Sequence, residues 1–356
     1  MRKSIKLFTT MLVLAVAIIV IQSLSDQKVE ASSQELYVYN WGDYIEPELI
    51  DRFEQESGYK VIYETFDSNE SMYVKVNSGS SPYDVIFPSE YMVDKMAEEH
   101  MLVELDKSLL PNLKNVDPYF LDQEFDEGNT YSVPYFWGTV GIAYNTEIYD
   151  QLELDYPTSY QDLWNPGLVD NVLLLDGARE IVGSSLNSLG YSLNSTNDNE
   201  LNQAKQNLLN LAPNVKGVVG DEIKMLMANN EAAAAIVWAG DAQLIQEDNE
   251  NIEFITPQAG SNIYLDNIAI PKTSSNIEGA HEFINFLMDN EVASINTDYV
   301  GYASPITSVM NEPEHIADET YYPSAKIREN LEYYANLDPD NLKRYNNIFL
   351  EFKISL

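Results

Sequence analysis

The chain has 356 residues, with 57 acidic against 20 basic side chains, a formal net charge of −37 and no cysteine. The charge argues against binding to nucleic acid, which requires a basic surface that neutralises phosphates. The absence of cysteine excludes disulfides, thiolate metal sites, a cysteine nucleophile and a lipid-modified cysteine. Hydrophobic residues make up 45% of the chain, so it can form ordinary globular cores, and its length suggests about two compact units.

Residues 1–31 have the pattern of a targeting segment. A basic stretch at Arg2–Lys6 precedes the unbroken apolar run Met11–Ile21, and Val29–Ala31 is a small-x-small cleavage pattern. The run is shorter than the usual membrane span of about 20 residues. We therefore expect a cleaved signal peptide, with an uncleaved signal-anchor as the alternative. Either way the protein is expected outside the cytoplasm, periplasmic or at the cell surface, released or tethered by this segment.

From Leu36 to Met96 the sequence alternates strand and helix patterns. Strands are predicted at Leu36–Asn40, Tyr59–Thr65 and Val85–Phe87, and helices at Pro47–Ser57, from a capping box at Asp67 and Glu70 to Asn77, and around Met92 and Met96. This order predicts a parallel sheet with right-handed crossovers.

A second series of strand and helix patterns begins near Val140. Strands are predicted at Val140–Tyr144, Val172–Leu175, Ala232–Trp238, Ile252–Ile255 and Ile263–Ile270, and helices at Ser159–Trp164, Arg179–Leu189, Asn199–Leu211, Glu222–Asn229, Asp241–Glu247 and Glu278–Met288. No flexible linker separates the two series. We therefore expect two α/β lobes packed closely across a cleft.

Candidate ligand-binding residues follow the carboxyl ends of the predicted strands, where open α/β sheets bind their ligands. They are Trp41, Tyr44, Ser89, Tyr91, Asp176, Glu180, Trp238 and Asp241, together with Tyr264 and Asp266 in the later strand. These aromatic rings and carboxylates, with Arg179 as the only basic residue nearby, suit a cationic amine. Structural roles compete with this hypothesis, because Ser89 is equally suited to cap a helix and Glu180 would favour a helix N-terminus.

Enzymatic alternatives find little support in the sequence. It contains no G-x-S-x-G, H-E-x-x-H, Walker or G-x-G-x-x-G motif and no calcium-loop spacing. We therefore expect neither catalysis nor a cofactor or metal. The three histidines, His100, His281 and His315, fall in polar contexts and are expected to be solvated. A carboxylate-pair hydrolase acting on glycans stays open as an alternative, because acids and aromatics also line sugar sites.

Five segments resemble the spermidine/putrescine-binding proteins of polyamine ABC transporters. They are Y-N-W-G-D-Y-I at Tyr39–Ile45, P-S-E-Y-M-V-D-K-M at Pro88–Met96, S-V-P-Y-F-W-G at Ser132–Gly138, D-G-A-R-E at Asp176–Glu180 and V-G-Y-A-S-P at Val300–Pro305. The similarity runs in order from about Leu36 to the C-terminus. It implies a two-lobed α/β fold of the type II periplasmic-binding-protein kind, with a ligand cleft between lobes joined by two crossover segments.

The resemblance also implies a division of the chain and a set of partners. Residues 32–139 plus 267–310 would form lobe 1, and residues 140–266 plus 311–356 would form lobe 2. The protein would bind a polyamine, spermidine or putrescine, and deliver it to a membrane permease driven by a cytoplasmic ATPase. A monomer is expected. A binding protein for another small solute, such as a sugar or an amino acid, is the alternative on the same fold.

Carried over position by position, the resemblance implies a ligand site. Its residues are Trp41, Tyr44, Ser89, Tyr91, Glu180, Trp238, Tyr264, Asp266 and Tyr302. Glu180 and Asp266 would bind ammonium groups, and Trp41, Trp238 and Tyr264 would hold the methylene chain.

Three positions depart from the family pattern. Gly177 replaces an acid, Tyr264 replaces an indole, and Tyr333 or Tyr334 replaces a glutamine. The number of amines that the site recognises, and hence spermidine against putrescine, is left open by these changes.

Overall fold

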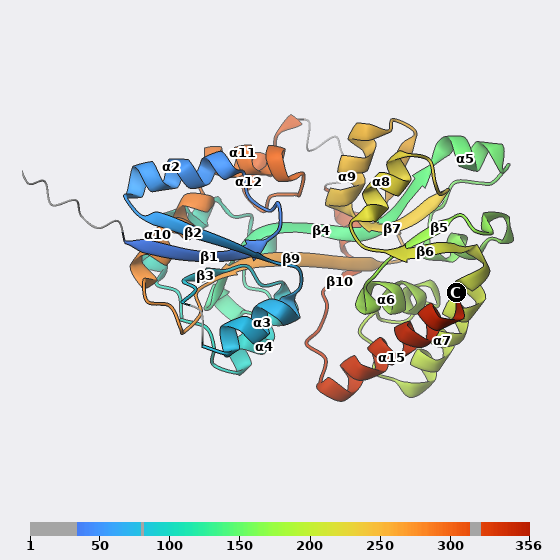
Figure 1. Cartoon of the computed structure of the whole chain (residues 1–356), viewed down its shortest axis with the longest axis horizontal. Coiled ribbons are helices and arrows are strands. Elements are labelled where there is room, and N and C mark those ends of the chain that lie inside the picture. Colours follow the sequence, from blue (N-terminus) through green and yellow to red (C-terminus); the bar gives the residue numbers. More distant parts are fainter. Residues whose placement is uncertain (1–33, 80–81, 314–321) are drawn as a thin grey trace, which may run out of the picture.

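The structure, a computed structural model, describes residues 34–79, 82–313 and 322–356. The expected targeting segment at residues 1–31 lies outside this description. The described chain is a mixed α/β structure in which two halves lie side by side along the long axis (Figure 1). Among its described residues, no helix is both long and apolar enough to cross a membrane.

The strands form one connected mixed sheet in the order β2-β1-β3-β9-β4-β7-β5-β6, with β10 paired to β9 and β8 paired to β4. Their bounds are β1 Glu35–Trp41, β2 Lys60–Phe66, β3 Val85–Ile86, β4 Ser132–Asn145, β5 Val172–Leu175, β6 Val215–Val219, β7 Ala234–Trp238, β8 Ile252–Ile255, β9 Ser261–Ala269 and β10 Leu331–Glu332. β1 pairs in parallel with β2 and β3, as the first series predicted. β9 runs antiparallel to β3 and β4.

Helices cover both faces of the sheet in each half (Figure 1). Their bounds are α2 Pro47–Ser57, α3 Asn69–Asn77, α4 Glu90–Glu98, α5 Thr146–Gln151, α6 Ala178–Ser188, α7 Asp198–Leu211, α8 Glu222–Ala228, α9 Ala239–Asp248, α10 Ile277–Leu287, α11 Asn290–Val300, α12 Thr307–Met310, α14 Ala325–Arg328 and α15 Pro339–Ser355. A short 3₁₀ helix spans Tyr160–Trp164. Most predicted elements are therefore confirmed within one or two residues.

Each half has its own hydrophobic core. The first core takes its buried side chains from residues 36–137 and 263–309. The second takes them from residues 140–254 and from α15, which contributes Tyr345, Phe349 and Phe352. Neither core is built from one continuous stretch of chain, because the chain crosses between the halves.

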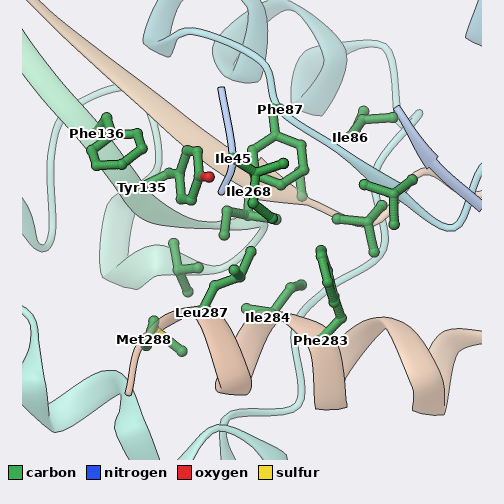
Figure 2. Close-up of a cluster of buried hydrophobic side chains, with 14 of the residues drawn as sticks. Ile45, Ile86, Phe87, Tyr135, Phe136, Ile268, Phe283, Ile284, Leu287 and Met288 are labelled. Carbon is green, nitrogen blue, oxygen red and sulfur yellow. The ribbon is translucent and has the colours of Figure 1, made fainter. Parts of the chain in front are cut away.

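The first core packs α10 against the central strands, as Figure 2 shows. Phe283, Ile284 and Leu287 point from α10 toward Phe87 and Ile268, and all five side chains are buried. The spacing of the three helix residues by one and three positions puts them on one face. This half therefore has an apolar core of its own.

β4 and β9 are the strands that pass from one half to the other (Figure 1). The first part of β4, Ser132–Thr139, pairs with β9, and from Val140 onward β4 pairs with β7 and β8 instead. All 14 residues of β4 are buried. β7 and β9 lie on opposite edges of β4, and the end of β7 and the start of β9 adjoin β4 at the neighbouring residues Val140 and Thr139.

Three local predictions from the sequence are wrong. Ser68, rather than Asp67, caps α3, because its side chain accepts the amide hydrogen of Ser71 at 3.2 Å. The strand predicted at Val140–Tyr144 begins eight residues earlier, at Ser132. His281 is 2% exposed rather than solvated. Its Nε2 accepts the amide hydrogen of Asp106 at 2.9 Å, and its Nδ1 lies 2.7 Å from the Ile277 carbonyl oxygen.

Candidate functional site

Asp266 of β9 is the centre of the candidate site. Its side chain is buried, and its two carboxylate oxygens accept hydrogen bonds from the Tyr44 hydroxyl at 2.7 Å and the Ser89 hydroxyl at 2.6 Å. Burial raises the pKa of Asp266 to about 6, although the hydrogen bonds from Ser89 and Tyr44 act in the opposite direction. A carboxylate with two hydroxyl donors and no basic partner among these contacts is suited to receive a cation.

Ser89 supports Asp266 rather than its own helix. It occupies the N-cap position of α4, but its side chain makes no capping hydrogen bond. Asn69 in the first turn of α3 holds it from the other side: the Asn69 amide nitrogen donates to the Ser89 hydroxyl at 3.0 Å, and the Ser89 backbone amide donates to the Asn69 side-chain oxygen at 3.1 Å. Asn69 was absent from the sequence-based candidates. It follows the carboxyl end of β2, so the strand-end rule could have found it.

Aromatic rings surround Asp266 on the side of the first half. The rings of Tyr44 and Tyr302 meet edge to face with centroids 5.2 Å apart, and the Tyr264 ring lies 6.1 Å from that of Tyr302. Trp41 is half-buried at the end of β1, where its indole nitrogen donates to the Phe87 carbonyl oxygen at 2.9 Å. Tyr264 is buried, yet its side chain belongs to neither hydrophobic core. Tyr44 belongs to the first core, and Trp41 and Tyr302 pack against it, so the first half positions these three rings.

The second half reaches this cluster through the start of α9. The Tyr302 ring lies directly against Gly240, where a Cβ atom would overlap it. Trp238, half-buried at the end of β7 and packed on the second core, precedes Gly240 by two residues. Asp241 follows Gly240 and is buried; burial raises its pKa, and Lys224 and Tyr302 lower it. The glycine thus allows α9 and Tyr302 to approach closely.

Glu180, Glu70 and Tyr91 form a second polar group, which contains residues of both halves. The Tyr91 hydroxyl donates to the Glu70 carboxylate at 3.3 Å. Burial raises the pKa of Tyr91, and the charges of Glu70 and Glu180 raise it further. Glu180 is half-buried in the first turn of α6; burial raises its pKa, while Arg179 lowers it and Glu70 raises it. Glu180 of the second half therefore lies close to Glu70 and Tyr91 of the first.

Gly177, at a position where the sequence resemblance implies an acid, leaves space for the Glu180 side chain. The Glu180 carboxylate folds back onto Gly177, where a Cβ atom would overlap it. The neighbouring Asp176 carboxylate instead pairs with Lys353 at 2.6 Å. An acid at position 177 would thus compete with Glu180 for the same space. Tyr334 is buried beneath the Arg179 guanidinium, 4.5 Å from its ring centroid.

Seven of the nine expected site residues are brought together in two sets. Hydrogen bonds and ring contacts join Tyr44, Ser89, Tyr264, Asp266 and Tyr302, and the charge of Glu180 raises the pKa of Tyr91. Trp41 is held by its hydrogen bond to the Phe87 carbonyl oxygen, and Trp238 precedes by two residues Gly240, which adjoins the Tyr302 ring. Within residues 34–79, 82–313 and 322–356, no three histidine or carboxylate side chains are grouped to hold a metal ion. The arrangement brings together carboxylates and aromatic rings, the two kinds of group that bind organic cations.

Comparison with known proteins finds one family model and several relatives that describe the same class of solute-binding protein. The model of the family described as "Bacterial extracellular solute-binding protein" matches residues 48–323. The spermidine/putrescine-binding periplasmic protein of Escherichia coli K12 is 38% identical over 301 residues, covering 84% of this chain and 86% of that protein. The protein of the same name from Salmonella typhimurium is 38% identical over 299 residues, covering 83% and 85%.

A solved structure also resembles the described fold. It is the spermidine/putrescine ABC transporter substrate-binding protein of Streptococcus pneumoniae, in complex with calcium and HEPES. It matches with a TM-score of 0.83 and 43% sequence identity, covering 91% of this chain and 99% of that chain.

Proposed function

Because the chain belongs to the bacterial extracellular solute-binding proteins, we propose that it is the polyamine-binding component of an ABC transporter, which takes up spermidine or putrescine outside the cytoplasm. The expected solute-binding fold is confirmed by the likeness to the S. pneumoniae protein. The observation that carries the ligand class is the buried Asp266 carboxylate, held by two hydroxyl groups among aromatic rings.

In this proposal each part of the polyamine has a matching surface. Asp266 and Glu180 bind terminal ammonium groups through charge-assisted hydrogen bonds. The rings of Trp41, Trp238 and Tyr264 hold the methylene segments and face the cations, and each such cation–π contact contributes about 0.5–2 kcal/mol. Supporting this, both the acids and the rings lie where the two cores adjoin, so one ligand can contact both halves.

Ligand binding would stabilise a closed arrangement of two lobes, since only that arrangement lets the ligand contact residues of both. We propose the lobes as residues 32–139 plus 267–310 and residues 140–266 plus 311–356. The loaded protein, a monomer without a reaction of its own, would deliver the polyamine to a membrane permease driven by an ATPase. The segment 1–31 would either be cleaved or tether the protein to the membrane.

Isothermal calorimetry with putrescine, spermidine and a neutral disaccharide tests this function. The amines should bind and their affinity should fall with added salt, because part of the attraction is electrostatic; the disaccharide should not bind. Glu180→Gln should weaken amine binding about 100-fold, within the range for truncating one partner of a buried charge pair. Glu278→Gln, an exposed acid in the first turn of α10, is the control for a purely helix-stabilising role and should bind like the parent.

Two outcomes would overturn the proposal. Salt-independent binding of the disaccharide without amine binding would favour the binding of a neutral solute. Cleavage of glycans into products would favour a hydrolase.

A further inference from the structure

Lys224 forms an ion pair with Asp241, a buried carboxylate beside the candidate site. The Lys224 ammonium of α8 lies 3.5 Å from the carboxylate of Asp241, whose side chain is 7% exposed. The lysine is 3.9 Å from Asp221, which is almost fully exposed. Of these two acids, Asp241 is the one that water does not solvate, so the nearby ammonium provides the compensating charge that a buried carboxylate requires.

Asp241 belongs to the same cluster of side chains as Asp266. The charges of Asp241 and Asp266 both raise the pKa of Tyr302, and both also raise the pKa of Tyr264. The Tyr302 ring contacts Tyr44, whose hydroxyl donates to Asp266. A polyamine bound at Asp266 would therefore have Asp241 as a further carboxylate nearby, were its charge not already balanced by Lys224.

We propose that Lys224 is a specificity-determining residue, which acts as a built-in cation and limits how many ammonium groups the site can bind. This inference rests on the proposed polyamine function and deepens it. With Lys224 present, Asp266 and Glu180 remain to pair with ligand ammonium groups, which matches a diamine or two of the three charges of a triamine. A third ammonium gains little at Asp241, because the lysine repels it.

The surroundings of Lys224 allow it to leave Asp241. α8 and α9 border an open hollow of about 590 Å³, which is lined by Lys224, Asp221, Leu244 and Asp248, among others. The lysine side chain is 35% exposed. It has both space and alternative acidic partners, so its removal from Asp241 does not require the core of the second half to repack.

A double-mutant cycle on Lys224 and Asp241 tests the inference, with spermidine and putrescine titrated into each variant by calorimetry. Lys224→Met keeps the length of the side chain and removes its charge. It should shift the ratio of the two dissociation constants roughly tenfold toward spermidine, since one carboxylate at short range is no longer balanced. Lys224→Arg should restore the parent ratio. Lys216→Met, which removes a lysine from the surface pair with Glu231 at 3.2 Å, should leave the ratio unchanged.

Asp241→Asn completes the cycle. Alone it leaves the positive charge of Lys224 without its buried partner, and it should weaken the binding of spermidine more than the binding of putrescine. Combined with Lys224→Met it should return the ratio to that of the parent, because both charges are gone. A merely structural role for the ion pair would change unfolding temperatures and both affinities together, without moving their ratio.

The outcomes separate the two proposals. A parent protein that binds polyamines, with a Lys224→Met variant whose ratio is unchanged, would overturn the role of Lys224 and leave the polyamine function standing. A parent protein that binds neither amine would overturn the polyamine function and with it this inference. A shifted ratio that Lys224→Arg and the double variant both reverse would support both.

Discussion

Replacing Asp266 with asparagine should stabilise the ligand-free protein and abolish tight amine binding. Burial raises the pKa of this carboxyl from its ordinary value of 3.8 to about 6. The folded chain therefore holds the proton more tightly than the unfolded chain. This favourable contribution to folding is fully present below pH 3.8 and is lost as the pH rises through about 6.

The magnitude follows from the two pKa values. A shift of about two units means that keeping Asp266 ionised in the folded state costs about 3 kcal/mol at pH 7.5. Asparagine avoids this cost and keeps an oxygen for the hydroxyl donors, with a loss of about 1 kcal/mol for one altered hydrogen bond. The net gain in the free energy of unfolding is about 2 kcal/mol at pH 7.5. It should shrink by about 2 kcal/mol at pH 4.5, where the parent carboxyl is already protonated in the folded state.

Urea denaturation of the ligand-free protein at both pH values measures these differences. Asp298→Asn, at an exposed aspartate of α11, is the matched control and should change stability little at either pH. Calorimetry with spermidine should show a loss of about 100-fold or more for Asp266→Asn, because the ammonium loses a buried charged partner. An Asp266→Asn variant that is destabilised equally at pH 7.5 and pH 4.5 would refute the reasoning, since its effect would then not come from the charge.

Two further predictions concern ligand binding. Amine affinity should fall as the pH drops below about 6, by up to tenfold per unit, because the ligand binds the ionised form of Asp266 and its own amines stay protonated; calorimetry between pH 7.5 and pH 5 checks this, and an affinity that is flat over this range would contradict it. Gly240→Ala should weaken amine binding about tenfold and lower the free energy of unfolding of the ligand-free protein by about 1–3 kcal/mol, because the new methyl group must displace the Tyr302 ring, which packs against the first core. Gly217→Ala is its control, since a Cβ atom there meets its nearest neighbours at an ordinary 3.8 Å, and equal losses of affinity in both variants would rule out the close approach as the cause.

Hydrophobic periodicity predicted those helices and strands whose ends are marked by local residues such as proline and glycine. α2 begins with Pro47 and ends at Ser57, followed by Gly58, whose φ of 81° suits glycine, and both ends were predicted. The first half of β4 was missed because all its residues are buried, which removes the alternation of a half-buried strand, and because Pro134 lies beside a register shift. α15 was missed although Asp338 and Pro339 form a regular helix start.

The sequence could nominate residues for the candidate site one by one, but it could not predict how they are arranged. The strand-end rule found Trp41, Ser89 and Trp238 because such positions follow from topology alone. It could not show that Ser89 turns from its helix toward Asp266, since that choice depends on β9, 177 residues later in the chain. The buried position of His281 was equally hidden, because the tertiary contact with the Asp106 amide satisfies its ring nitrogen.

The interleaving of the two cores constrains how the chain can reach its native state during synthesis. The first core needs residues up to 309, and the second needs α15 near the end of the chain. A nascent polypeptide emerging N-terminus first can therefore complete neither globule until most of its length has appeared, because pairings so distant in sequence form late. Such a chain remains unfolded for longer than one with sequential domains, which suits any route that requires threading before folding.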